Sequence, residues 1–211
     1  GLFNLAKAKS HQLTRLTLAV KNLYGCIPGP RKAVYHVWSR CVRGAYLFDA
    51  PDFDRRFWII NREDQLSSLF AIEIEFRAEM WNHLHLILRT RPEIVQRWSN
   101  EEVVRRWLII TKLAKCMTDE LPTPDPQRTE ELLKNKKEIK RIRRRLSSIS
   151  WFMGTLLENI ARRSNAEDDT SGKFWSTRYG CRECTDPSSV LICGIYVDLN
   201  PIRAGEANSV E

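Results

Sequence analysis

The sequence lacks any apolar run close to the roughly 20 residues that a membrane-spanning helix requires, and it shows no internal repeat. Acidic residues are scarce relative to basic ones, with 26 Asp and Glu against 34 Lys and Arg, which gives a formal net charge of +8. This imbalance indicates a polyanionic partner, with nucleic acid ahead of an anionic membrane surface. The 43% hydrophobic and 28% charged residues are typical of a globular protein and argue against a disordered chain. A length of 211 residues suffices for one domain with a buried core and some appendages, but not for two large domains.

No secretory leader is expected, because residues 1–12 form neither the positively charged nor the apolar region of such a leader. We therefore expect a cytoplasmic, thiol-reduced setting and, for a bacterial protein that binds DNA, association with the nucleoid. The six cysteines are then expected to be free thiols; they are Cys26, Cys41, Cys116, Cys181, Cys184 and Cys193.

The spacing of apolar residues predicts a mixture of strands and helices. Period-2 alternation favours strands over residues 34–41, 70–76 and 83–89. In the second of these strands we expect one side to carry Phe70, Ile72, Ile74 and Phe76. Helical spacing favours helices over residues 52–69, 103–115, 147–163 and 188–199, the last stopped by Asn200 and Pro201.

The stretch between the second and third of these helices is unusual in composition. Residues 121–126 contain three prolines, each of which removes an amide donor and disfavours helix in its predecessor, so an extended linker is expected. A basic helix is expected over residues 129–146, because eight Lys and Arg lie between Lys134 and Arg145 with Glu138 as the one acid.

His83 and His85 form the first candidate for chemistry. Side chains repeat every second residue on a strand, so both imidazoles share one face, while the alternating leucines suit the core. Two such imidazoles can bind one divalent ion and leave positions open for a third ligand and for substrate oxygens. The spacing alone is weak, and two structural histidines remain the alternative.

Tyr196 and Asn200 form the second candidate, because residues four apart share a helix face. A tyrosine can attack a phosphodiester and hold the product covalently, and a metal can polarise the phosphate under attack. The amide oxygen of Asn200 could complete the metal site. The alternative is that Tyr196 is a core residue and that Asn200 only ends the helix before Pro201.

Three motifs occur in order along the chain: Asn82-His83-Leu84-His85-Leu86-Ile87-Leu88-Arg89, Gly172-Lys173-Phe174-Trp175 and Tyr196-Val197-Asp198-Leu199-Asn200-Pro201-Ile202-Arg203-Ala204-Gly205. Together they resemble the landmarks of REP-associated tyrosine transposases, which belong to the HUH single-strand DNA transposase and nuclease superfamily. The segment Tyr35-His36-Val37-Trp38-Ser39-Arg40 resembles the first strand of that family. The resemblance covers about residues 34–207.

This resemblance implies an α+β fold, a ferredoxin-like or RRM-like sandwich with a central antiparallel sheet, extra helices and an N-terminal appendage. It implies that His83 and His85 bind a divalent metal, Mg or Mn, with Asn200 as third ligand, and that Tyr196 is the nucleophile. The implied reaction cleaves single-stranded, hairpin-forming DNA through a 5′-phosphotyrosine link and rejoins it to another strand, as in DNA transposition. The implied assembly is a monomer or a homodimer.

Basic and aromatic residues are the candidates for DNA contact. From the basic helix and elsewhere, the candidates for phosphate contact are Arg40, Arg43, Arg89, Lys140, Arg141, Arg143, Arg144, Arg145, Arg178 and Arg203. Trp38, Trp175 and Tyr179 could stack on bases, although core packing is the commoner fate of an aromatic side chain. A solvated helix face is the alternative interpretation of the basic run.

Residues 1–33 are expected to form a fusion segment in front of a catalytic domain over residues 34–211. Residues 4–29 resemble a fragment of an uncharacterised domain family found in some iron–sulfur proteins, and neither His11 nor Cys26 is assigned a ligand role. Two features depart from the transposase pattern: Trp81 replaces a small residue before Asn82, and three thiols, those of Cys181, Cys184 and Cys193, fall where few are expected.

Two functional alternatives stay open beside the strand-transfer enzyme. A protein of the same shape could recognise structured single-stranded DNA without catalysis. An RNA-binding sheet protein would instead expose aromatic residues on its central strands, where this chain has the histidine pair.

Overall fold

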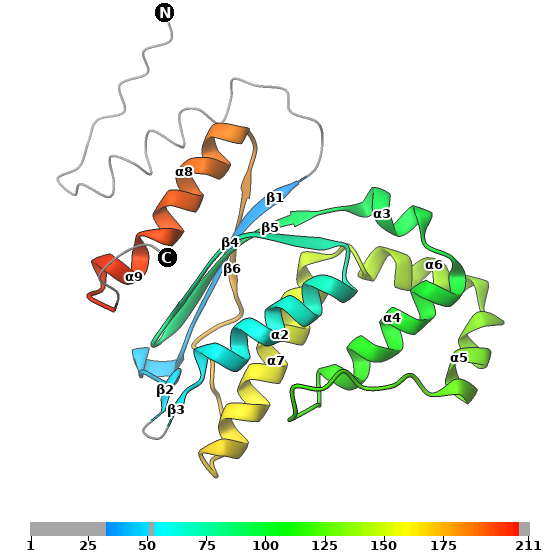
Figure 1. The fold of residues 1–211 in the computed structure, drawn as a ribbon, viewed down its shortest axis with the longest axis horizontal. Coiled ribbons are helices and arrows are strands. Elements are labelled where there is room, and N and C mark those ends of the chain that lie inside the picture. The colour runs from blue at the N-terminus through cyan, green and yellow to red at the C-terminus, as the bar shows by residue number, and fades with distance from the viewer. Residues whose placement is uncertain (1–32, 51–52, 207–211) are drawn as a thin grey trace, which may run out of the picture.

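A four-stranded antiparallel sheet forms the centre of the protein (Figure 1). The computed structural model describes residues 33–50 and 53–206. The strands are β1 (Val34–Arg40), β4 (Ile72–Met80), β5 (His83–Thr90) and β6 (Gly180–Cys184), in the order β4-β5-β1-β6. With helices between β1 and β4 and between β5 and β6, the connectivity is the split β-α-β arrangement of ferredoxin-like folds. The predicted α+β fold with a central antiparallel sheet is confirmed.

The two faces of the sheet carry different layers. Helices α2 (Arg56–Leu69) and α7 (Ile149–Glu167) lie on one face, and α8 (Pro187–Asp198) lies on the other (Figure 1). As predicted, Leu84, Leu86 and Leu88 of β5 enter the larger core, together with buried residues of α2 and α7. Ile87, which alternates with them, joins a smaller cluster with Val197 of α8. Successive side chains of β5 therefore alternate between the layers on the two faces of the sheet.

A helical lobe extends from one end of the sheet. It contains α3 (Pro92–Arg97), α4 (Asn100–Leu113), α5 (Pro126–Leu133) and α6 (Lys136–Arg145). Ser99 caps α4, since its hydroxyl accepts the backbone N–H of Glu102. The predicted single helix over residues 129–146 is wrong: the chain turns at Lys134, and the side chain of Asn135 accepts the backbone N–H of Glu138 to begin α6. An Asn side chain that accepts a hydrogen bond from the backbone N–H three residues later favours a break between helices and caps the second one.

Strand β4 contains a bulge that corrects one prediction. The pairing with β5 shifts between Ile74, opposite Leu88, and Phe76, opposite Ile87. Ile72 and Ile74 consequently contact the larger core, whereas Phe76 joins the smaller cluster under α8. The extra residue reverses the side-chain alternation, so Phe76 does not share a side with Phe70, Ile72 and Ile74.

The C-terminal helix ends where it was predicted to end. Helix α8 stops at Asp198 with Leu199 as its cap, and a separate single-turn helix, α9 (Asn200–Arg203), which was not predicted, then begins with Pro201 in its first turn. Strand β6 was not predicted, since its central residues are polar and exposed and show no apolar alternation. The short η1 (Val42–Gly44), β2 (Asp49–Ala50) and β3 (Phe53–Asp54) were not predicted either.

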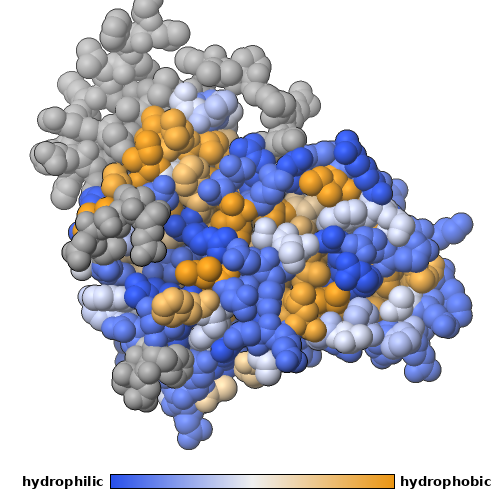
Figure 2. Space-filling view, in the orientation of Figure 1, coloured by the Kyte–Doolittle hydropathy of each residue, from blue (hydrophilic) through white to orange (hydrophobic). Residues whose placement is uncertain are grey.

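The outward face of α8 is apolar, with Leu191 57% and Ile195 41% exposed, and forms the orange band at the upper left of Figure 2. Within residues 33–50 and 53–206, no helix combines the length and the apolar character needed to cross a bilayer. The predicted N-terminal segment, with His11 and Cys26, lies outside the described residues.

Candidate functional site

The histidine pair lies beneath α8. In the antiparallel pairing of β1 with β5, Arg40 lies opposite His83 and Trp38 lies opposite His85. Residues directly opposite each other share a sheet face, so His36, Trp38 and Arg40 line the same face as the histidine pair. This is the face that α8 crosses (Figure 1).

Four rings meet at this place. The ring centroid of His85 lies 5.1 Å from that of His83 and 5.1 Å from that of His36. The Tyr196 ring, carried by α8, lies 6.0 Å from His85 and 6.3 Å from His36. All four side chains are half-buried, so the site is neither sealed in the core nor fully in water. The structure thus brings together Tyr196 and the two predicted histidines, and adds His36.

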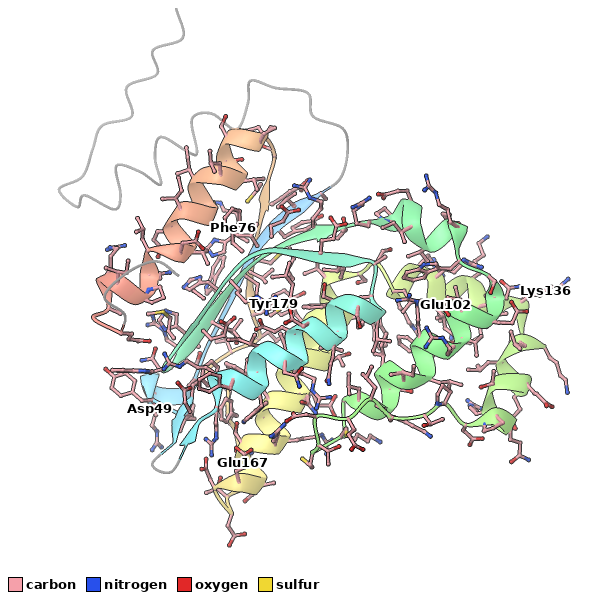
Figure 3. The ribbon with its side chains drawn as sticks, viewed as in Figure 1. Asp49, Phe76, Glu102, Lys136, Glu167 and Tyr179 are labelled. Carbon is pink, nitrogen blue, oxygen red and sulfur yellow. The ribbon has the colours of Figure 1, made fainter. Side chains whose placement is uncertain are left out.

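A glycine lets α8 approach the sheet closely enough for this contact. A Cβ atom on Gly194 would lie 2.5 Å from Cε2 and Cζ of Phe76 on β4, which is far inside van der Waals contact. Figure 3 shows Phe76 between α8 and the sheet, and the smaller cluster includes both Phe76 and Tyr196. Gly194 therefore sets the height of Tyr196 above the imidazoles, two residues further along the same helix.

Hydrogen bonds orient the imidazoles. Nδ1 of His83 contacts the side-chain oxygen Oδ1 of Asn82, so His83 must carry its proton on Nδ1 and keep a lone pair on Nε2. Nδ1 of His85 lies 2.9 Å from Nε2 of His36. If His85 donates from Nδ1, its own Nε2 is likewise free. A hydrogen bond from Nδ1 of a metal-binding histidine fixes the tautomer and the orientation of the ring.

The three imidazoles are neutral at pH 7. Burial lowers the pKa of His36 to about 4 and that of His83 to about 4, with further lowering by Arg182 and Arg40 respectively. Burial and then the neighbouring His36, His83 and Arg40 lower the pKa of His85 to about 3. Neutral imidazole is the form that binds a metal ion and the form that accepts a proton.

The donor set fits a divalent ion only if an oxygen ligand is added. In the part of the chain that the structure describes, no three His, Cys, Asp or Glu side chains gather as a metal site. Asn200 is the candidate for the missing donor: it begins α9, which packs against β4, and its Nδ2 atom is buried without a hydrogen-bond partner among the described residues, although it forms no hydrogen bond with His83 or His85 there. Nitrogen and oxygen of an amide are alike in shape, so a flipped Asn200 would place Oδ1 at that buried position. His83, His85 and Asn200 would then hold the ion, with substrate oxygens completing its shell.

The predicted phosphate-contacting residues divide into two groups by location. Arg40 lies on the face of the imidazoles, and Arg203 lies in α9, seven residues after Tyr196. Both are exposed, as are Arg43 in η1 and Arg178 just before β6. The second group, from Lys140 to Arg145, lies on α6 in the helical lobe, on the far side of the molecule from α8 (Figure 1; Lys136 in Figure 3).

Several of these basic side chains already have partners within the protein. Arg89 pairs with Glu75, and Arg141 and Arg145 pair with Glu138. Arg143 donates to the carbonyls of Val95 and Trp98. Lys140 and Arg144 remain exposed.

Two of the aromatic candidates for base stacking have structural roles. Trp175 is buried and donates from Nε1 to the carbonyl of Leu157, 2.9 Å away, so it is a core residue. The hydroxyl of Tyr179 lies 3.0 Å from that of Ser150. Trp38 alone of the three is exposed.

Sequence reasoning missed His36 and Arg182 as site residues. His36 alternates with the buried Val37 on β1, which signals a second face but not what lies on it. The contact of His36 with His85 depends on the pairing of β1 with β5, and the position of Arg182 opposite His36 depends on the pairing of β1 with β6. These strands are far apart in the chain.

The sequence model of a family described as Domain of unknown function (DUF362) matches residues 1–130. The chain belongs to the DUF362 family. The match includes His36, His83 and His85 and ends before α7, whereas Tyr196 and Asn200 lie beyond it. The match also continues across residue 33, where the boundary of the fusion segment was predicted. It extends far beyond residues 4–29, to which the resemblance to an uncharacterised domain family was limited.

Membership of DUF362 overturns the resemblance to REP-associated tyrosine transposases. The family match covers the segments 35–40 and 82–89, on which half of that resemblance rested, and no relative of the transposase kind was found. Alternating His and Leu arise on any strand with one buried face, so such motifs are not specific to one family.

One curated relative gives a short match. The thylakoid-associated protein sll1697 of Synechocystis sp. is 50% identical over 36 residues, which is 17% of this chain and 11% of that protein. The chain therefore spans about a tenth of the length of this relative. No solved structure matches the chain.

Proposed function

We propose that this DUF362 protein is a metal-dependent DNA strand transferase and nuclease that acts on single-stranded, hairpin-forming DNA through Tyr196. The observation that carries the proposal is the position of the Tyr196 ring, 6.0 Å from His85 on the sheet face that also holds His83 and His36. The net charge of +8 supports a polyanionic substrate. A cytoplasmic, nucleoid-associated location and a monomeric or homodimeric state go with this proposal.

The chemistry is a transesterification. The Tyr196 hydroxyl oxygen attacks the phosphorus, a 5′-phosphotyrosine bond forms, and the bond from phosphorus to the 3′-oxygen breaks. The phenolic proton passes to water, because the Nε2 lone pairs of His83 and His85 would hold the ion and Nε2 of His36 accepts from His85. The departing 3′-oxygen takes up one proton from water to become a hydroxyl. The reverse attack by another 3′-hydroxyl rejoins the strand. A divalent ion held by His83, His85 and Asn200 would supply polarisation of the phosphate oxygens.

The test is the capture of the covalent intermediate. The full chain is incubated with hairpin oligonucleotides that have single-stranded flanks of random sequence and a 3′-terminal fluorophore, with Mg²⁺, with Mn²⁺ or with EDTA. We expect a fluorescent adduct that survives denaturing electrophoresis, requires the metal and maps to Tyr196 by peptide mass spectrometry.

Two variants make the result decisive. Tyr196→Phe should abolish the adduct and leave DNA binding intact, whereas Tyr46→Phe, which changes an exposed tyrosine on another segment, should form the adduct normally. Binding without any adduct in the parent protein, or an adduct that persists in Tyr196→Phe, would overturn the proposal. The first of these results would favour a catalytically inactive module that binds structured DNA.

A further inference from the structure

Trp38 is the exposed aromatic residue of the sheet face that carries the imidazoles. Its side chain is 39% exposed, although it lies on β1, an interior strand of the sheet. His85 lies directly opposite Trp38 on β5. The ring centroid of Trp38 lies 5.1 Å from that of His36. An indole in this position has one side against the protein and the other open to a ligand, within reach of the imidazole site.

Gly180 on the neighbouring strand makes room for this indole. Gly180 pairs with Trp38 in the register of β1 with β6. A Cβ atom at residue 180 would lie 2.2 Å from Cε2 and 2.3 Å from Cζ2 of Trp38, a separation that real atoms do not reach. The indole therefore extends over the backbone of β6 at Gly180, in space that the side chain of any other residue at position 180 would occupy.

Two arginines flank the indole on the same sheet face. Arg40 lies two residues after Trp38 on β1, and Arg182 on β6 lies opposite His36. Both guanidinium groups are exposed, and neither forms an ion pair within residues 33–50 and 53–206. An aromatic plane beside cationic side chains that have no acidic partner is the arrangement with which proteins hold a base and its flanking phosphates in single-stranded nucleic acid.

We infer that Trp38, over Gly180, is a stacking site for one unpaired nucleobase of the single-stranded DNA, with Arg40 and Arg182 contacting the phosphates on either side. The inference rests on the proposed function for the class of ligand, but it concerns binding and not the reaction. The stacked base would lie next to the scissile phosphate, because Trp38 lies directly opposite His85. The site would select strands that are unpaired at this position, since a base in a duplex offers no free face.

Binding is measured in the Tyr196→Phe protein, so that no covalent step contributes. The probe is a fluorescein-labelled single-stranded 15-mer of thymidine, with a series of 15-mers that carry one abasic site at each position in turn. Loss of one stacked base costs about 1–3 kcal/mol, which corresponds to a weakening of affinity of roughly 5- to 150-fold. We expect this loss for Trp38→Ala on the full 15-mer and for the parent on one of the abasic 15-mers.

The two losses must not add. Trp38→Ala should bind that abasic 15-mer no more weakly than the full one, because the stacking partner is already absent. Gly180→Ala leaves the indole in the protein but displaces it, and should weaken binding in the same way.

The matched controls are Gly154→Ala, where nothing lies within 4 Å of the new Cβ, and Phe57→Ala, which removes another exposed aromatic ring. Neither should change affinity. Equal affinity of Trp38→Ala and the parent, or fully additive losses, would overturn the stacking site. These outcomes leave adduct formation by Tyr196 as a separate measurement, so the two proposals can fail independently.

Discussion

Gly194→Ala is the most direct test of how α8 positions Tyr196. The new Cβ would lie 2.5 Å from two ring atoms of Phe76, whereas ordinary contacts are 3.4–4 Å. Relief of the overlap requires a displacement of about 1 Å, either of the Phe76 ring or of α8. Phe76 lies in the small cluster between β4 and α8, so the ring has little space in which to move.

The magnitude follows from comparison with Gly154→Ala on α7, where the new methyl group meets nothing within 4 Å. Both substitutions gain the same helix-forming contribution of about 0.5–1 kcal/mol. Gly194→Ala alone also has the overpacking cost of about 1–3 kcal/mol. The difference in unfolding free energy between the two variants should therefore be about 1–3 kcal/mol, with Gly154→Ala more stable than the parent protein.

The assays are urea unfolding of both variants and the yield of the Tyr196 adduct with the hairpin oligonucleotides. A displacement of about 1 Å at Tyr196 can lower the rate of adduct formation by roughly 100-fold. Phe76→Leu, which shortens the obstructing ring, should restore part of both losses when combined with Gly194→Ala. If Gly194→Ala is as stable as Gly154→Ala and forms the adduct at the parent rate, the close packing of α8 on β4 does not position Tyr196.

Three further predictions concern the core and the basic helix. Burial, together with Glu79, raises the pKa of Glu63 well above its usual range. The folded protein therefore keeps a proton on Glu63 that the unfolded chain releases near pH 4.5. This difference favours the folded state at low pH, and its contribution to the unfolding free energy is lost as the pH rises. Urea unfolding should accordingly show a smaller loss of stability from pH 5 to pH 8 in Glu63→Gln than in the parent, and an equal loss would contradict the reasoning. Asn159 is fully buried, and its Nδ2 donates to the carbonyls of Leu113 and Cys116 at the end of α4, so Asn159→Leu should lower the unfolding free energy by about 2–4 kcal/mol; a change below 1 kcal/mol would count against this role. If α6 contacts DNA, Arg144→Ala should reduce the slope of log affinity against log salt by about 0.7 without loss of stability, whereas Arg143→Ala, which removes donors to two carbonyls, should chiefly destabilise the protein.

Much of the secondary structure could be predicted from local patterns. Alternation on β1 and β5, the helical spacing of apolar residues in α2, α4 and α7, the apolar composition of α8 and the Ser99 cap all depend on neighbours within a few residues. The failures share a physical reason. The bulge that reverses Phe76 depends on pairing with β5, and the exposed strand β6 is held by its partner β1 more than by its own side chains.

The candidate site was predicted in part. Local spacing placed His83 and His85 on one face and put Tyr196 on a helix, and the structure brings these residues together. The family assignment could not be made from the same motifs, because a two-residue alternation of His and Leu follows from strand geometry alone. Arg143 and Arg89, predicted to contact phosphate, could not be distinguished by sequence from free arginines, since their partners Trp98 and Glu75 are distant along the chain or on a neighbouring strand.

By itself the sequence determined which faces of β1 and β5 are apolar, where α2, α4, α7 and α8 lie, and the excess of positive charge. Those properties follow from period and composition, which a chain carries before it folds. Only the tertiary structure decided that His36 lies against His85, that Gly194 seats Tyr196 above them and that Gly180 makes room for Trp38. Each of these depends on a strand register or a closest approach between segments distant in sequence, and such distances are fixed only when the whole core is packed.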